Sequence, residues 1–335
     1  MYKGITAGVL AAPAFLALIA AAQDVQPPAG LPPFTFPANN PYSAAKVELG
    51  RYLYFDRRLS ADESVSCASC HDPKFAFTDG AATSTGIRSQ KGNRSAPTIL
   101  NRAYSLGQFW DGRAATLEDQ AKGPMANPIE MGSTHDAIVT RLRTVAGYRP
   151  MFAKAFGSEE ITIDRVAMAI ANFERTVLSG NAPYDRYKRG DKKALTAAQV
   201  RGMSVFFDKA KCDRCHEGPN FTLNMYANIG VGADKPEPDV GRYAVTKNPR
   251  DWGAFKTPTL REIEHTGPYM HDGSLKTLEE VVELYDKGGV PNKNLDEQIK
   301  PLHLTATEKS DLVAFLKALS GEGWKHVKAP ESFPQ

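Results

Sequence analysis

Two short motifs contain all four cysteines of the chain, and their spacing is typical of one kind of chemistry. The segments Cys67–His71 and Cys212–His216 both read C-x-x-C-H, the attachment signature of c-type haem. In this signature the two thiols add to the haem vinyl groups, and the adjacent histidine ligates the iron through its imidazole. We therefore expect two covalent haems, attached at Cys67, Cys70, Cys212 and Cys215 and ligated by His71 and His216.

Other uses of paired cysteines fit the chain less well. Two C-x-x-C pairs could bind zinc, but the interval from Cys70 to Cys212 is far longer than the usual spacing within a zinc ribbon. A thioredoxin-like redox site needs a βαβ context, which is not visible in the sequence. Structural disulfides are the remaining option in an exported protein. None of these alternatives accounts for a histidine directly after both pairs.

The composition is that of an ordinary soluble globular protein. The chain has 335 residues, of which 42% are hydrophobic and 24% are charged, and its formal net charge is +3. A length of this order predicts about two domains. The weak positive charge, without any basic cluster, gives no indication of nucleic-acid binding.

Residues 1–22 have the pattern of a secretory signal peptide. Lys3 gives a positive start, the run Ile5–Ala22 is almost wholly apolar, and its closing alanines supply the small residues that precede a cleavage site. An uncleaved anchor is the alternative, because the run approaches the length that spans a bilayer. We favour cleavage and a periplasmic protein, since c-type haem is attached outside the cytoplasm. No other stretch is long and apolar enough to span a membrane.

Beyond the signal peptide, the chain reads as a leader followed by two similar halves. The proline-rich residues 23–40 predict an extended leader rather than a packed element. Each half then reads helix, C-x-x-C-H motif, long irregular segment and closing helix, with few strand signals. We expect an all-α protein of two cytochrome c-like domains, residues 41–180 and 192–325, joined by a linker at residues 181–191.

A weak internal repeat supports this division. Gly50–Asp56 aligns with Gly202–Asp208, and both segments come shortly before a C-x-x-C-H motif. The first copy lies at the end of a helix expected at residues 42–56.

The two halves also close alike. Helical periodicity predicts closing helices at residues 163–178 and 305–319. Each ends in Leu-Ser-Gly, and we expect Gly180 and Gly321 to occupy the position after the helix end.

Three further segments extend the pattern. Phe109–Arg113 reads F-W-D-G-R, Pro128–Met131 reads P-I-E-M, and Pro268–Gly273 reads P-Y-M-H-D-G. Together with the two C-x-x-C-H motifs, they make the chain from Tyr42 to Gly321 resemble the bacterial di-haem cytochrome c peroxidases.

The resemblance implies that the two haems differ in role. The N-terminal haem, ligated by His71, would react with peroxide, and Glu130 matches the acid–base glutamate above its open face. A carboxylate placed there can carry the proton that cleavage of the O–O bond requires. Gln120 matches a glutamine that orients peroxide, and Trp110 matches a tryptophan between the haems. The second haem, ligated by His216, would supply or share electrons.

The sixth ligand of the second haem separates the branches of this family. Ordinary members place a methionine at a fixed distance after the histidine of the P-Y-x-H segment, and here that position holds Tyr285. This departure resembles the MauG-like branch, in which a tyrosine is the ligand. An anionic phenolate favours ferric and higher oxidation states. Tyr285 also falls on the buried stripe of an expected helix, so it could be a core residue, with Met225 or Met270 as the ligand instead.

Further departures bear on activation and on partners. The position at which many members carry a histidine that blocks the first haem holds Ile87, so we expect that haem to be open without prior reduction. The position of a surface tryptophan that MauG uses to draw electrons from its protein substrate holds Ala210. The resemblance also implies a calcium ion between the domains, with backbone carbonyls of Thr266 and Pro268 as ligands, although Ser95 replaces the usual asparagine.

These expectations define one main hypothesis and two alternatives. The chain would be a periplasmic di-haem peroxidase that reduces hydrogen peroxide with electrons from a small cytochrome c or cupredoxin. The first alternative is oxidative modification of a protein or peptide partner, and the second is a plain electron carrier. Ile87 and Glu130 argue against the carrier, because electron transfer alone needs no open haem beside a carboxylate. The resemblance leaves a homodimer open.

Overall fold

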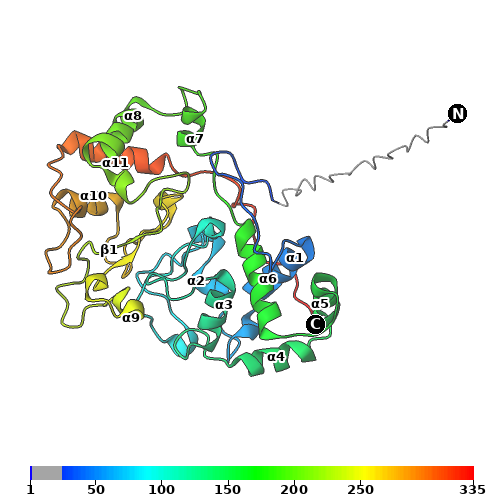
Figure 1. The fold of residues 1–335 in the computed structure, drawn as a ribbon. Helices are drawn as coiled ribbons and strands as arrows, with labels where there is room; N and C mark the ends of the chain where they lie inside the picture. The colour runs from blue at the N-terminus through cyan, green and yellow to red at the C-terminus, as the bar shows by residue number, and fades with distance from the viewer. Residues whose placement is uncertain (2–24) are drawn as a thin grey trace.

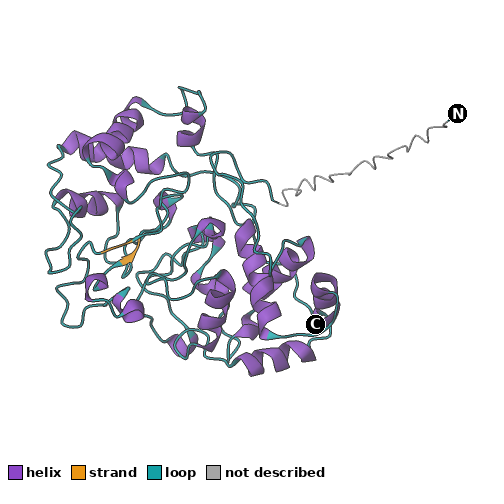
Figure 2. Ribbon diagram, in the orientation of Figure 1, coloured by secondary structure: helices purple, strands orange, loops and turns teal. Residues whose placement is uncertain are grey.

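The computed structural model describes Met1 and residues 25–335 and shows two groups of helices side by side (Figure 1). The expected signal peptide falls, apart from Met1, outside the described residues. Helices joined by long irregular segments dominate the described chain, as the sequence predicts (Figure 2). The only strands there, β1 (Tyr226–Ala227) and β2 (Phe255–Lys256), form one short antiparallel pair. None of the described helices is long and apolar enough to cross a membrane.

Each group of helices belongs to one half of the chain. The first consists of α1 (Ala44–Phe55), α2 (Cys67–Cys70), α3 (Leu117–Ala126), α4 (His135–Thr144), α5 (Tyr148–Phe156) and α6 (Ile163–Thr176). The second consists of α7 (Pro183–Lys188), α8 (Ala197–Ser204), α9 (Tyr243–Thr246), α10 (Leu278–Asp286) and α11 (Ala306–Lys317). Helices α1, α6 and α11 confirm the three predicted helices, since no end differs from its prediction by more than two residues.

Side-chain caps fix where the principal helices begin. Thr305 and Glu308 form a reciprocal capping box at the start of α11, and Thr277 and Glu280 form another at the start of α10. Each box satisfies two backbone N–H groups that have no partner inside the helix.

One helix contact recurs in both halves and depends on the aligned glycines of the repeat. A Cβ on Gly50 of α1 would overlap the carbonyl oxygen of Ala169 in α6. A Cβ on Gly202 of α8 would overlap the carbonyl oxygen of Asp311 in α11. The absence of a side chain therefore lets the helix before each haem motif lie directly against the closing helix of its half.

Two sets of buried apolar side chains lie beneath these helices. The first includes Leu53, Phe152 and Phe173, and the second includes Phe206 and Phe315. The contact between α1 and α6 lies over the first set and the contact between α8 and α11 lies over the second, so each helix pair covers its own core.

The C-terminal tail belongs to neither pattern, because it crosses back from α11 to the first half (Figure 1). Trp324 is buried in the first apolar set, with its ring centroid 6.1 Å from that of Phe77. At the end of the chain, the backbone N–H of Gly147 donates to the carbonyl of Gln335 at 2.8 Å.

The leader is extended, as predicted, but the expectation that it does not pack is wrong. Leu31 and Asn40 are buried, and the hydroxyl of Tyr104 donates to the carbonyl of Pro32 at 2.7 Å. The aromatic ring of Phe34 also contacts that of Tyr104. Apolar and aromatic side chains between the prolines therefore fix the leader to the folded chain without any helix.

The roles expected for Gly180 and Gly321 are also wrong. Helix α6 ends at Thr176 and α11 at Lys317, so neither glycine follows its helix directly. Instead Gly180 exchanges two backbone hydrogen bonds with Glu322, and a Cβ on Gly321 would overlap the backbone of Gly180. These glycines permit a close approach of two chain segments, a contact that local sequence cannot reveal.

The segment expected to be the linker, residues 181–191, contains helix α7. Its residue Asp185 is buried and forms an ion pair with the buried Arg261, whose Nη2 donates to Asp185 Oδ1 at 2.9 Å. The segment is therefore anchored to the second half.

We predict that Gly202→Ala lowers the free energy of unfolding by about 1–3 kcal/mol, because the added methyl forces α8 away from α11. Gly50→Ala should have a similar effect on the contact between α1 and α6. The control is Gly92→Ala, where a Cβ would meet its nearest neighbour at 3.8 Å, an ordinary contact. Denaturant unfolding of the haem-containing protein measures all three, and equal midpoints would contradict the proposed packing role.

Candidate haem and active site

The histidine of each motif is held by the backbone in the same way. His71 Nδ1 lies 3.3 Å from the carbonyl oxygen of Phe77, and His216 Nδ1 lies 3.1 Å from that of Phe221. A proton on Nδ1 leaves the Nε2 lone pair free for a metal. Burial lowers the pKa of both imidazoles, that of His216 to about 4. Both rings are therefore neutral at pH 7, which is the form that ligates iron.

A second repeat, which the sequence reasoning missed, supports these carbonyl acceptors. Thr98 and Thr259 each follow a proline, and their hydroxyls donate to the carbonyls of Ala76 and Asn220, both at 2.6 Å. Ala76 directly precedes Phe77, and Asn220 directly precedes Phe221. Phe77 and Phe221 are the residues whose carbonyls bind the histidine rings. Both phenylalanines have left-handed backbones, with φ of 62° and 51°. The signal in the sequence was the Pro-Thr pair, which is too common to stand out alone.

The cysteines remain unpaired, so the structure forms no disulfide among them. Burial raises the pKa of the Cys70 thiol to about 11 and that of the Cys212 thiol to about 12. Within residues 25–335, no three His, Cys, Asp or Glu side chains converge on a metal site. The arrangement gives no support to the zinc and disulfide alternatives.

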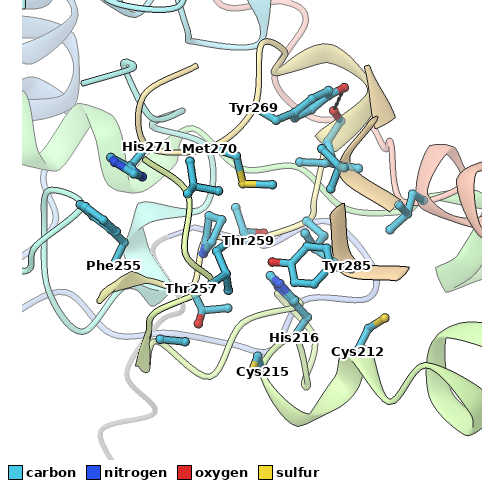
Figure 3. Close-up of a pocket in the computed structure, with 18 of the residues that line it drawn as sticks. Cys212, Cys215, His216, Phe255, Thr257, Thr259, Tyr269, Met270, His271 and Tyr285 are labelled. Carbon is cyan, nitrogen blue, oxygen red and sulfur yellow. Dashed lines mark hydrogen bonds between the residues drawn. The ribbon is translucent and has the colours of Figure 1, made fainter. Parts of the chain in front are cut away.

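The second motif opens into a cavity of about 440 Å³. Cys212, Cys215, His216 and Tyr285 all line it (Figure 3). Much of the remaining wall is apolar, with side chains from α10 and α11 that include Val281, Val282, Leu312 and Leu316. Two thiols, a neutral imidazole and an apolar wall are the groups that a covalent haem requires. The residues therefore fit this cofactor.

Two of the three residues considered as sixth ligand reach this cavity. Tyr285 and Met270 line it (Figure 3), whereas Met225 is not among the lining residues. Burial, followed by the nearby thiols of Cys212 and Cys215, raises the pKa of Tyr285 above its ordinary value. The geometry thus narrows the choice to Tyr285 and Met270.

Glu130 is partly buried beside the first motif. The Asn127 amide donates to its Oε1 at 2.8 Å. Burial raises the pKa of Glu130, while the charge of Arg113 and the bond from Asn127 oppose that shift. The charge of Glu130 in turn contributes to raising the pKa of Cys67 and Cys70, after the larger effect of their burial.

The loop that contains Ile87 packs directly against the loop of Glu130. Ile87 is only 2% exposed, and its backbone N–H donates to the carbonyl of Glu130 at 2.9 Å. A Cβ on Gly86 would overlap the carbonyl of Ile129, and one on Gly132 would overlap the Ile87 side chain. Residue 87 therefore supports the position of Glu130, a role that the sequence did not indicate.

Trp110 lies where the two halves meet. It lines the cavity of the second motif, and its indole Nε1–H donates to the carbonyl of Ser95 at 2.8 Å. Its own carbonyl accepts from the backbone N–H of Lys256 in β2 at 2.7 Å. The first bond fixes the indole ring, and the second joins the backbone of Trp110 to the second half of the chain.

The remaining candidates are Gln120 and the proposed calcium ligands. Gln120 is partly buried on α3, and no hydrogen bond among the described residues joins it to Glu130. The calcium candidates Ser95, Thr266 and Pro268 all line the cavity, as does Ala210.

The comparisons with known proteins agree with this combination of helical fold and paired motifs. Residues 44–193 match the family model described as di-haem cytochrome c peroxidase. The chain is 40% identical over 328 residues to the cytochrome-c peroxidase IdrP1 of Pseudomonas sp. (strain SCT), a match that covers 89% of this chain and 86% of the relative. It is 43% identical to the methylamine utilization protein MauG of Methylorubrum extorquens, with 85% and 81% covered.

Among solved structures, the chain is similar to a MauG-like protein associated with microbial copper homeostasis. The TM-score is 0.82 at 37% identity, with 88% of this chain and 95% of that chain covered. The chain belongs to the di-haem cytochrome c peroxidase family. It is an oxidoreductase of that family.

Proposed function

We propose that the chain is a periplasmic peroxidase that reduces hydrogen peroxide at its first haem site without prior reduction of the second. The observation that carries the proposal is Glu130, a carboxyl group with a raised pKa held beside Cys67 and Cys70. Electron transfer alone does not require a group that accepts and donates protons. Peroxide cleavage does, because a proton must move from one oxygen to the other.

The residues that would hold the cofactors follow from the motifs and their surroundings. Cys67, Cys70 and His71 would hold the first haem in residues 41–180, and Cys212, Cys215 and His216 would hold the second in residues 192–325. When bound, the haem iron supplies the redox chemistry by which peroxide takes up two electrons and two protons to give two waters.

Glu130 has one oxygen fixed and one free for proton transfer. Asn127 holds Oε1, and Oε2 accepts no hydrogen bond from the described residues. Oε2 would accept a proton from one peroxide oxygen and return it to the other, which leaves as water. The hydrogen bond between the Ile87 N–H and the Glu130 carbonyl keeps the loop in place during the transfer. Gln120 would orient the peroxide.

The second haem site would exchange electrons with the first rather than react with peroxide. Trp110 lies between the halves with both its indole N–H and its carbonyl bonded, and its fixed aromatic ring would lie between the two haems. Tyr285 as the sixth ligand would favour oxidised states, which suits the sharing of oxidising equivalents. The electron donor would be a small periplasmic cytochrome c or cupredoxin.

Oxidative modification of a protein or peptide partner is the second candidate function. Tyr285 in the cavity and the likeness to MauG support it. Ala210, in place of the surface tryptophan of MauG, opposes it. A calcium ion bound by Ser95 and by the backbone carbonyls of Thr266 and Pro268 is a further part of the proposal. It rests on the resemblance to the family alone, because no carboxylate among the described residues lines the cavity that these residues share.

Glu130→Gln should slow the reaction of the fully oxidised protein with peroxide by about 10²–10⁴-fold, because the amide cannot accept the proton. Stopped-flow mixing without reductant measures the rate. Glu159→Gln, which changes an exposed glutamate, is the control. An unchanged rate in Glu130→Gln would exclude the proposed proton transfer.

The pH dependence of this rate should report the charge of Arg113. Glu130 must be deprotonated to accept a proton, so the rate falls as the pH drops through its pKa. Because the positive charge of Arg113 lowers that pKa, Arg113→Gln should move the acid limb to higher pH. Arg113→Lys keeps the charge and should restore most of the wild-type profile. A limb that does not move in Arg113→Gln would mean that another group controls it.

The ligand of the second haem can be identified from two variants. A second haem with six ligands would be low-spin in its ferric state. If Tyr285 is the sixth ligand, Tyr285→Phe should change the absorption and electron paramagnetic resonance spectra of this low-spin haem, while Met270→Leu leaves them unchanged. The opposite pattern would assign Met270 and return Tyr285 to the core.

A further inference from the structure

The cavity of the second motif has an excess of positive charge. Among the described residues no Asp or Glu side chain lines it. Six basic side chains do. Arg102 and Lys256 lie inside the protein, whereas Lys209, Lys211, Arg214 and Lys300 are exposed, and Lys209 is paired with Glu308 at 2.7 Å. An apolar wall cannot compensate buried cations, and buried charges are normally paired. The cavity therefore has the electrostatic character of a site for an anion.

Two of these cations are held inside the protein with few partners. Lys256 is 5% exposed, and its ammonium donates to the carbonyl of Gly107 at 2.6 Å. Arg102 donates from Nε to the carbonyl of Thr98 at 2.7 Å, and its two Nη groups donate to nothing else among the described residues. Several strong donors thus remain available at the cavity wall.

Arg102 and Lys256 line the same cavity, where their positive charges oppose each other. Burial lowers the pKa of Lys256 well below its ordinary value, and the charge of Arg102 lowers it further, against the opposing effect of Asp111. Asp111 is already paired with Arg94 at 2.7 Å. Like charges that face one cavity are stable there when a negative group lies between them.

Glu174 is the carboxyl group that acts most directly on Arg102, and it neutralises the charge of Arg102 only in part. Burial lowers the pKa of Arg102 to about 10, and Glu174 opposes that shift. Burial also raises the pKa of Glu174 to about 7, so this carboxyl is only partly ionised at neutral pH. Glu174 is not among the residues that line the cavity.

We propose that Arg102 and Lys256 form the carboxylate-binding end of this cavity and hold the propionate groups of the haem attached at Cys212 and Cys215. The inference rests on the haem attachment proposed above. A c-type haem has two propionates, which are the only anionic groups on its edge. A guanidinium binds a carboxylate through paired N–H groups, and an ammonium binds it as a point charge.

The assignment connects the two halves of the chain. Arg102 comes from the first half, whereas Lys256 lies in β2 of the second. Through the propionates, the second haem would be bound by both halves. A buried cation beside a haem also disfavours the additional positive charge of the ferric iron, so the pair would raise the reduction potential of the second haem.

The test uses the haem-containing protein and the variants Arg102→Gln and Lys256→Gln. An optical redox titration should show the midpoint of the second, low-spin haem shifted to more negative potential in both, because removal of a cation favours ferric iron. Lys256→Arg keeps the charge and should stay close to wild type. The control is Lys300→Gln, which removes an exposed cation from the same cavity and should shift the midpoint less.

Infrared difference spectra between the oxidised and reduced proteins provide the second readout. The carboxylate bands of the propionates should move in Lys256→Arg as well as in both glutamine variants. Lys256→Arg therefore still tests the assignment if Arg102→Gln and Lys256→Gln do not assemble with haem. Midpoints and carboxylate bands equal to those of Lys300→Gln would overturn the assignment. Mass spectrometry of the denatured wild type counts covalent haems, and a count below two would contradict the haem attachment itself.

Discussion

A histidine buried in its neutral form must satisfy one ring nitrogen with the protein if the other is to face a metal. His71 and His216 meet this constraint through backbone carbonyls of residues in the left-handed conformation. A threonine hydroxyl fixes the loop that contains each carbonyl. The glycine-mediated helix pairs then hold the core of each half around the motif. Most of the architecture can be traced outward from this single requirement.

The same scaffold has different surroundings in the two halves. Beside the first motif, Glu130 is held by Asn127 and by the loop of Ile87. Beside the second, the cavity is lined by the phenols of Tyr269 and Tyr285 and by several basic groups, but by no carboxylate among the described residues. The hydrogen bonds that recur in both halves fix how each histidine is presented, while the loops that differ between the halves determine what lies near it. Under the proposed function, those loops separate proton transfer from electron sharing.

The sequence was sufficient for features that depend on local patterns. Spacing and periodicity predict the two motifs and the helices α1, α6 and α11. They also align Gly50 with Gly202 in the repeat. It was insufficient where distant segments meet. The backbone approach at Gly180 and Gly321, the packing of the leader, and the position of Arg102 and Lys256 on one cavity wall involve residues far apart in the chain. Such contacts have no local signature, because any exposed loop permits glycine, proline or a basic residue.

The return of the C-terminal tail has a consequence for the order in which the molecule can mature. Trp324 fills part of the first apolar core, and Gln335 accepts a backbone hydrogen bond from Gly147. Chains generally fold from the N-terminus as they are made, yet the first half here cannot complete its packing until the last residues are available. The first apolar core, against which Cys67 packs, therefore reaches its final packing only after the second half of the chain is present.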